Sequence, residues 1–284
     1  MHKRAVSDSE IFDRARRRKR RDRALPRYGD HSFLRDHMVE GLLERLEGVK
    51  RSFADVLDLG SFDATIDIPG ARIARIDAGF GFAKSGGGVQ ADEDRLPFAD
   101  ASFDLVVSAG VLDSVNDVPG ALALARRVLR PDGLFLAAFL GAGTLSTLRA
   151  SFLAAEGDRP AARFHPQIDV RSAGDLLSRA GFALPVADIE TLTVRYGSIG
   201  GLLDDVRGMG AGNLLPGAAP LSRETLMRAA AAFADRADPD GRTAERFEIV
   251  TLTGWAPDPS QPKPARRGSG TTSLAAALKA TRPD

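Results

Sequence analysis

Cysteine does not occur in this chain of 284 residues, which excludes disulfides, thiolate catalysis and cysteine-ligated zinc. Long apolar runs are also missing, because the longest, Leu134 to Leu140, is far shorter than the ~20 residues that span a bilayer. The N-terminus shows neither the apolar core of a secretory signal nor the acid-poor composition of a transit peptide. We therefore expect a cytoplasmic protein without a transmembrane segment.

Signatures of common catalytic sites are scarce as well. The four histidines, His2, His31, His37 and His165, have no partner at the spacing of a metal site. Neither a Walker loop nor a G-x-S-x-G nucleophile elbow occurs. We therefore predict no metal site, and the catalytic residues stay unknown at this stage.

Charge is present in both signs but is unevenly distributed. The net charge is +1, whereas residues 1–30 hold eleven Lys/Arg against five Asp/Glu. Such a basic run can bind RNA, a membrane surface or an acidic protein face, or it can form a solvated, partly helical arm. The run lacks the interleaved aromatics of single-strand readers. We favour the solvated arm and keep RNA binding as a weaker alternative.

Short apolar strands alternate with helices in the first half of the chain. Alternation of this kind predicts a mostly parallel sheet with right-handed crossovers. Residues 189–196 and 246–255, rich in Thr, Val and Ile, predict two late strands that close the sheet as an antiparallel pair. We therefore predict an α/β fold, a three-layer Rossmann-like sheet of about seven strands. The other expected strands are 56–59, 72–76, 89–91, 103–108 and 134–139; the expected helices are 31–48, 119–129, 172–180, 202–209 and 223–236; the expected turns are 86–88 and 131–133.

The carboxyl ends of the strands are where open α/β sheets bind ligands. Asp58 and Gly60 stand at the end of the first expected strand, Asp77 and Asp92 end the second and third, and Ser108 ends the fourth. An acid 17 residues after the glycine suits ribose hydroxyls, since the usual separation is ~20 residues. Asp92 could hold an adenine amine. The alternative is that both acids are ordinary polar strand ends.

The segment after the fourth strand contains further polar candidates. Asp113 or Asn116 could face the pocket. Capping of the next helix by Asn116 or Asp117, ahead of Pro119, is the interpretation that we favour.

Two segments resemble a known family. Residues 91–108 (ADEDRLPFADASFDLVVS) resemble the central block of class I S-adenosylmethionine (SAM) methyltransferases, type 11, and residues 126–133 (RRVLRPDG) resemble their turn before the fifth strand. A narrower resemblance rests on the motifs Phe12-Asp13-Arg14, Val115-Asn116-Asp117, Gly143-Thr144-Leu145, Gly208-Met209-Gly210 and Gly254-Trp255. In these motifs the chain resembles the mitochondrial respiratory complex I assembly factor of methyltransferase fold and its alphaproteobacterial relatives, akin to the malonyl-carrier-protein methyltransferases of biotin synthesis. The resemblance implies a seven-stranded sheet, SAM as cofactor, and a role in modifying an arginine on a complex I subunit.

The cofactor turn departs from the family pattern D-x-G-x-G-x-G. Gly60 holds the first glycine position, but Phe62 and Ala64 hold the second and third. The second glycine normally lets the backbone approach the ligand, so a phenylalanine there puts a ring where the cofactor would lie. The crossovers on either side of Asp77 are also shorter than in the family, and Pro69-Gly70 interrupts any helix in the first.

Two main functions follow. The chain is a SAM-dependent methyltransferase acting on a protein or on a carrier-linked acyl group, with Asp58, Gly60, Asp77, Asp92 and Ser108 at the cofactor. Alternatively, it is a degenerate methyltransferase-fold scaffold that binds a client such as a respiratory subunit. The side chain of Phe62 discriminates: a ring that fills the pocket favours the scaffold.

Three parts are expected along the chain: a basic arm and helix (1–48), a methyltransferase-like domain (49–256) with a helical insert at about 200–240, and a Pro-rich extended tail (257–284).

Overall fold

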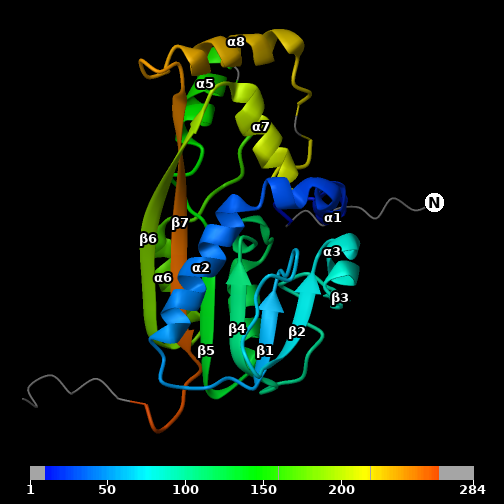
Figure 1. The fold of residues 1–284 in the computed structure, drawn as a ribbon, viewed down its shortest axis with the longest axis vertical. Coiled ribbons are helices and arrows are strands. Elements are labelled where there is room, and N and C mark those ends of the chain that lie inside the picture. The colour runs from blue at the N-terminus through cyan, green and yellow to red at the C-terminus, as the bar shows by residue number, and fades with distance from the viewer. Residues whose placement is uncertain (1–9, 159, 218, 262–284) are drawn as a thin grey trace, which may run out of the picture.

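The computed structural model describes residues 10–158, 160–217 and 219–261. The elements are α1 (Arg14–Ala24), η1 (Leu25–Asp30), α2 (Phe33–Glu47), β1 (Asp55–Leu59), β2 (Arg72–Asp77), α3 (Phe80–Ser85), β3 (Val89–Gln90), β4 (Phe103–Ala109), η2 (Leu112–Ser114), α4 (Val118–Val128), β5 (Leu129–Leu140), α5 (Ser146–Glu156), α6 (Val170–Arg179), β6 (Ala183–Tyr196), α7 (Ile199–Gly208), α8 (Arg223–Ala234) and β7 (Thr243–Trp255). The strands form one sheet in the order β3-β2-β1-β4-β5-β7-β6 (Figure 1). β1 to β5 are parallel, and β7 lies antiparallel between β5 and β6. The predicted fold class is confirmed.

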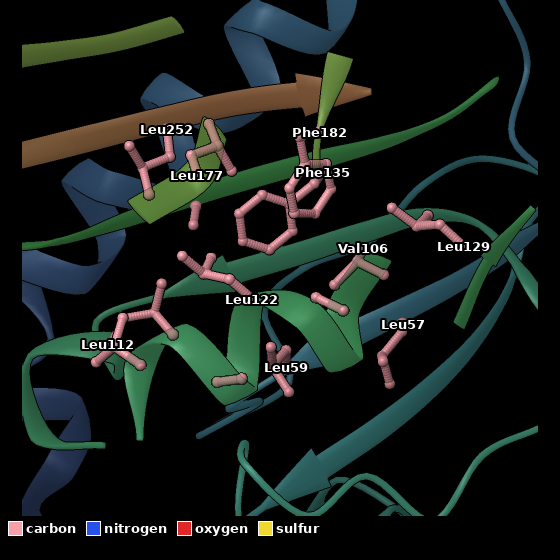
Figure 2. Packing of buried hydrophobic residues seen from close by; sticks show 14 of the residues in the cluster. Leu57, Leu59, Val106, Leu112, Leu122, Leu129, Phe135, Leu177, Phe182 and Leu252 are labelled. Carbon is pink, nitrogen blue, oxygen red and sulfur yellow. The ribbon is translucent and has the colours of Figure 1, made fainter. Parts of the chain in front are cut away.

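One face of the sheet is covered by α4 and α6. Successive side chains of a strand point to opposite faces, so Leu57 and Leu59 of β1 turn toward this side. They join Val106 of β4, Leu122 of α4 and Leu177 of α6 in a single buried cluster (Figure 2). The apolar stripe of α4 is therefore the reason that this helix packs on the sheet.

The opposite face is covered by α2. Met38 and Leu42 of this helix pack on Val56 of β1 and Leu105 of β4. No helix lies between β1 and β2 in the described chain, as Pro69-Gly70 predicted; instead Ile66, fully buried in that segment, joins the α2 cluster. The second crossover differs from the prediction, because the short helix α3 precedes the glycine loop.

β5 begins five residues before the predicted strand and includes the predicted turn at 131–133. Its pairing with β4 jumps from Leu129–Phe103 to Leu134–Leu105, and Asp132 adopts φ of +59°. The Pro-Asp-Gly sequence therefore lies in an irregularity of the strand, because β5 advances five residues there while β4 advances two. Regular pairing with β4 resumes at Leu134.

The C-terminal half extends the sheet and adds helices in the region of the expected insert. β6 and β7 run beyond the parallel strands to a helical end built from α5, α7 and α8 (Figure 1). Phe152 of α5, Leu202 of α7, Phe233 of α8 and Phe247 of β7 form the core of that end. No helix in the described part of the chain is long and apolar enough to cross a membrane. The start of the expected arm, residues 1–9, and most of the expected tail, residues 262–284, lie outside the described residues.

Candidate functional site

The carboxyl ends of β1 to β4 bring the predicted site residues together at one buried edge of the sheet, which we call the crevice because open α/β sheets bind ligands there. Asp58, Asp77 and Ser108 are fully buried there, and Asp92 is 3% exposed. Backbone hydrogen bonds tie the strand ends: the amide of Gly60 donates to the carbonyl of Ile76 at 3.0 Å, and that of Ala91 to the carbonyl of Asp77 at 3.1 Å. Convergence at one edge is what a parallel sheet dictates. The binding roles of these residues remain predictions.

α1 lies across this edge, over the ends of β4, β1 and β2 (Figure 1). Four of its arginines recur at i, i+3, i+4 and i+7, a spacing that places them on one helix face. We call Arg14, Arg17, Arg18 and Arg21 the arginine stripe. Asp13 caps the helix by accepting from the amide of Arg16 at 2.9 Å. The expectation of a solvated arm is wrong for α1, because the stripe faces the crevice.

Each member of the stripe is paired with a crevice carboxylate. Arg17 donates to Glu93 at 2.6 and 2.8 Å, and both side chains are buried. Arg18 donates to Asp92 at 2.7 Å. Arg14 donates to both oxygens of Asp94 at 2.7 and 2.6 Å, and it stands 3.3 Å from Asp92. Paired forks of this kind are the strong form of charged hydrogen bond.

Asp77, the predicted ribose ligand, has all its acceptor directions occupied. Arg21 donates through Nε at 2.8 Å to one oxygen and through Nη2 to the other. The amide of Gly79 donates at 2.7 Å and that of Phe62 at 3.0 Å. Burial alone would raise the pKa of this carboxyl, but the attraction and hydrogen bonds of Arg21 outweigh burial and lower it. Asp77 is therefore ionised at neutral pH, and its negative charge is already balanced by Arg21.

The ring of Phe62 fills the space beside this pair. It is 4% exposed and stacks on Tyr28 at 5.0 Å between ring centroids, with Phe82 edge-on at 5.5 Å. The guanidinium carbon of Arg21 lies 3.7 Å from the centre of the Phe62 ring. Arg21 thus sits between a carboxylate and an aromatic face, which is a favourable place for a cation.

The degenerate turn keeps the backbone shape that glycines would give. Phe62 and Ala64 adopt φ of +44° and +61°. This left-handed region costs a residue with a side chain roughly 1–2 kcal/mol. Gly60 has φ of +88°, and a Cβ there would lie 2.4 Å from Val111. Phe62 and Ala64 therefore take a left-handed backbone conformation that glycine adopts without this cost.

Asp58 is the unusual carboxylate of the crevice. Neither of its oxygens has a hydrogen-bond partner among the described residues. Arg35 and Arg75 form only long ion pairs with it, at 4.0 and 3.9 Å, which is beyond hydrogen-bond distance. Burial raises the pKa of Asp58 to about 7, and the two arginines oppose that rise only in part. The hydroxyl of Ser108, in contrast, donates to the carbonyl of Leu59 at 2.9 Å and fastens β4 to β1.

An adenosyl ligand does not fit the crevice in this arrangement. The carboxylate that would take ribose hydroxyls already accepts four hydrogen bonds, and Arg21 and Phe62 occupy the space beside it. Among the described residues, the crevice oxygens left without partners are both of Asp58, one of Asp92 and the hydroxyl of Ser61.

The polar residues after β4, namely Asp113, Asn116 and Asp117, make different contacts. Asn116 binds the backbone of Phe12, accepting from its amide at 2.7 Å and donating to its carbonyl at 3.0 Å. This contact fixes the entry to α1. Asp117 rather than Asn116 caps α4, by accepting from the amide of Gly120 at 2.8 Å. Asp113 lines a separate cavity of about 480 Å³ on the other side of α1.

The arginine stripe is the feature that sequence reasoning missed. Its helical spacing was readable, and so was the acidic triplet Asp92-Glu93-Asp94. The contact between the stripe and the triplet could not be predicted, because more than 70 residues separate them in the sequence.

The chain matches a family described as "Methyltransferase domain" over residues 54–137. The matched segment runs from β1 into β5 and contains every predicted site residue.

Relatives in two groups match nearly the whole chain. "Arginine-hydroxylase NDUFAF5, mitochondrial" is 33% identical in Danio rerio, over 93% of this chain and 88% of the relative, and 34% identical in Homo sapiens, over 93% and 82%. "Malonyl-[acyl-carrier protein] O-methyltransferase" of Laribacter hongkongensis (strain HLHK9) is 32% identical, over 89% of this chain and 92% of the relative.

Solved structures show the same fold at low identity. A Bacillus halodurans C-125 protein described as a methyltransferase has a TM-score of 0.55 at 15% identity, over 78% of this chain and 99% of its own. The YcgJ protein of Bacillus subtilis has a TM-score of 0.52 at 14% identity, over the same shares.

Proposed function

Because the chain belongs to the SAM-dependent methyltransferase family that includes the NDUFAF5 arginine-hydroxylases and the malonyl-[acyl-carrier protein] O-methyltransferases, we propose that it holds a protein client during assembly of respiratory complex I, with its adenosyl crevice closed by α1. The complex I client comes from the resemblance to the assembly-factor branch. The cytoplasm is the proposed compartment.

A single observation carries the closed crevice: Arg21 lies between Asp77 and the ring of Phe62. Separating a buried, hydrogen-bonded ion pair costs about 3–5 kcal/mol. Micromolar binding requires ~8 kcal/mol of free energy from the ligand itself. A SAM molecule that must first displace Arg21 would therefore lose roughly a hundredfold to several thousandfold in affinity.

A second candidate is turnover of SAM after α1 withdraws. Its support is the retained Gly60 and the convergence of Asp58, Asp77 and Asp92 at one edge. The acceptor would then be a protein or a carrier-linked acyl group, as in the two groups of relatives. RNA binding through the arm is the weakest candidate, since the crevice carboxylates already hold four of the arm's arginines.

Asp58 offers a way to separate the two main candidates in cells. In cells that lack this chain, we expect less assembled complex I on native gels, and we expect the wild-type gene to restore it. Asp58→Asn should restore it equally, because Asp58 makes no hydrogen bond within the described chain on which the fold depends.

The matched control is Asp175→Asn, an exposed acid of α6. Failure of Asp58→Asn alone, with the protein still present at wild-type level, favours turnover over client holding. Unchanged complex I in cells lacking the chain contradicts the proposed function altogether.

A further inference from the structure

The cavity that Asp113 lines lies on the face of α1 that points away from the crevice. It measures about 480 Å³, within the range of ligand pockets, and it is bounded by α1, α5, α7 and the segments around residues 165 and 213. The arginine stripe does not reach it. Its cations are a separate set, of which Arg16 and Arg20 come from α1 and Arg207 comes from α7.

These three arginines lack adequate partners. Arg20 and Arg207 have no carboxylate within 4 Å among the described residues. Arg16 approaches Asp13 only at 3.9 Å and otherwise donates to the carbonyl of Leu215 at 2.6 Å. The buried Nε of Arg20 has no hydrogen-bond partner in the described chain. That Nε atom is costly to leave in this state, because its water has been removed without a replacement, whereas Arg207 is exposed to solvent.

The remaining charged groups do not offset this excess. Arg163 also lines the cavity and pairs with Glu156 at 2.5 Å. Asp113 is the one carboxylate in the lining formed by the described residues, and burial raises its pKa to about 6. Burial, then repulsion from Arg16, Arg23 and Arg207, lowers the pKa of Arg20. The cavity is therefore short of negative charge.

Neutral and apolar groups complete the lining. His165 accepts from the amide of Leu214 through Nε2 at 2.8 Å, and burial lowers its pKa to about 4. At neutral pH the ring is therefore uncharged, with its proton on Nδ1. Leu148 and Phe152 form an apolar wall, and Leu221 is exposed at 38% although it lines the same cavity. An occupant with both an anionic and an apolar part matches this lining.

The basic surface extends past the cavity. Arg16, Arg20 and Arg23 recur along α1 over seven residues, which spans about 10 Å of helix. Arg23 is exposed and has no ion pair in the described chain. A single small anion would meet only part of such a row, whereas an extended segment with several carboxylates would meet all of it.

We propose that this cavity and the adjoining outer face of α1 bind an acidic, apolar polypeptide segment of a protein partner, with carboxylates on Arg16, Arg20 and Arg207 and an apolar side chain against Leu148 and Phe152. The site lies outside the adenosyl crevice. It deepens the proposed function by naming the chemistry of the client, and it rests on that proposal for the partner being a protein.

The test uses fluorescence anisotropy with the full chain and a labelled, capped peptide of alternating leucine and glutamate. We expect a dissociation constant on the order of 10–100 µM at low salt. Arg20→Gln combined with Arg207→Gln should weaken binding at least ~10-fold, since each removes a direct partner of the anion. The matched control is Arg171→Gln combined with Arg179→Gln, two exposed arginines of α6, which should stay within ~2-fold.

Two further probes separate the sources of the carboxylate. The leucine–glutamine counterpart of the peptide should not bind, and free suberate should compete weakly. Equal binding of the glutamine peptide, or equal losses in the control pair, overturns the proposal, and so does an absence of peptide binding. Suberate binding without peptide binding overturns it in favour of a small acyl acid.

The two proposals fail in different ways. Peptide binding together with unchanged complex I leaves this site standing and removes the proposed client. Loss of complex I without peptide binding supports the proposed client and removes this site.

Discussion

The two faces of α1 carry the same residue type in opposite states. On the crevice face, Arg14, Arg17, Arg18 and Arg21 each meet a carboxylate, and two of these pairs are buried. On the cavity face, the Nε of Arg20 meets no partner in the described chain. The difference shows that a run of basic residues has no single role. The paired face holds the helix in place, and the unpaired face remains available to a partner.

The paired face should give the largest effect when it is broken. Arg21→Ala leaves Asp77 buried and without its cation, so we expect a loss of about 3–5 kcal/mol in the free energy of unfolding. Urea denaturation measures it. Lys19→Ala, an exposed change on the same helix, should stay within about 0.5 kcal/mol. A loss below about 1 kcal/mol for Arg21→Ala would mean that the pair does not hold α1 in solution.

Asp58 sharpens the comparison within the crevice, because it is a buried carboxylate to which no arginine of the described chain donates a hydrogen bond. Its pKa of about 7 in the folded chain exceeds its ordinary value of 3.8, so between these pH values the folded state binds more protons than the unfolded state. Stability must therefore fall as pH rises through that window. From pH 5 to 8 the wild type should lose about 2–3 kcal/mol more than Asp58→Asn.

Urea midpoints of both proteins across that pH range measure the effect. Asp113 and His165 titrate in both and cancel in the difference. Parallel pH profiles would show that Asp58 is hydrated or paired in solution.

The strained turn predicts a smaller gain. Ala64→Gly removes a Cβ from a residue with φ of +61° and should stabilise the chain by about 1 kcal/mol. A glycine also frees the unfolded chain, which limits the gain. The control is Ala187→Gly in β6, where the backbone has no positive φ to relieve, so this variant should destabilise. Urea denaturation compares the two, and destabilisation by both variants would contradict the strain.

The unpaired face should give the smallest change in stability. Arg20→Gln removes a cation that has no carboxylate partner in the described chain and is repelled by Arg16 and Arg207, so its unfolding free energy should change by less than about 0.5 kcal/mol in the destabilising direction. Thermal denaturation beside Arg21→Ala measures the contrast between the two faces. A loss comparable to that of Arg21→Ala would mean that Arg20 has a structural partner.

Most of the sheet could be predicted from the sequence, because each strand has a local pattern of apolar or β-branched residues. Alternating apolar strands such as 103–108, and Thr/Val/Ile-rich strands such as 246–255, predicted the sheet within a few residues. The Pro-Asp-Gly sequence at 131–133 predicted a turn, whereas it forms an irregularity inside β5. Both structures favour the same residues, so composition does not distinguish them. The short helix α3 was missed because its sequence is rich in glycine and phenylalanine.

The candidate site was readable only in part. The strand-end acids follow from topology, so their convergence could be predicted. The partners of those acids could not, because the ion pairs join α1 to residues more than 50 positions away and depend on how the helix docks. The burial of Asp58 without a hydrogen-bond partner in the described chain also follows from packing, and no sequence pattern indicates it.

Titration calorimetry with SAM tests the closed crevice most directly. The wild type should bind with a dissociation constant weaker than ~100 µM. The variant Arg21→Ala/Phe62→Gly/Ala64→Gly, which opens Asp77 and restores the glycine turn, should bind at least ~10-fold more tightly if circular dichroism shows it folded. Wild-type binding below ~10 µM, or a folded variant that binds no better than the wild type, would contradict the account.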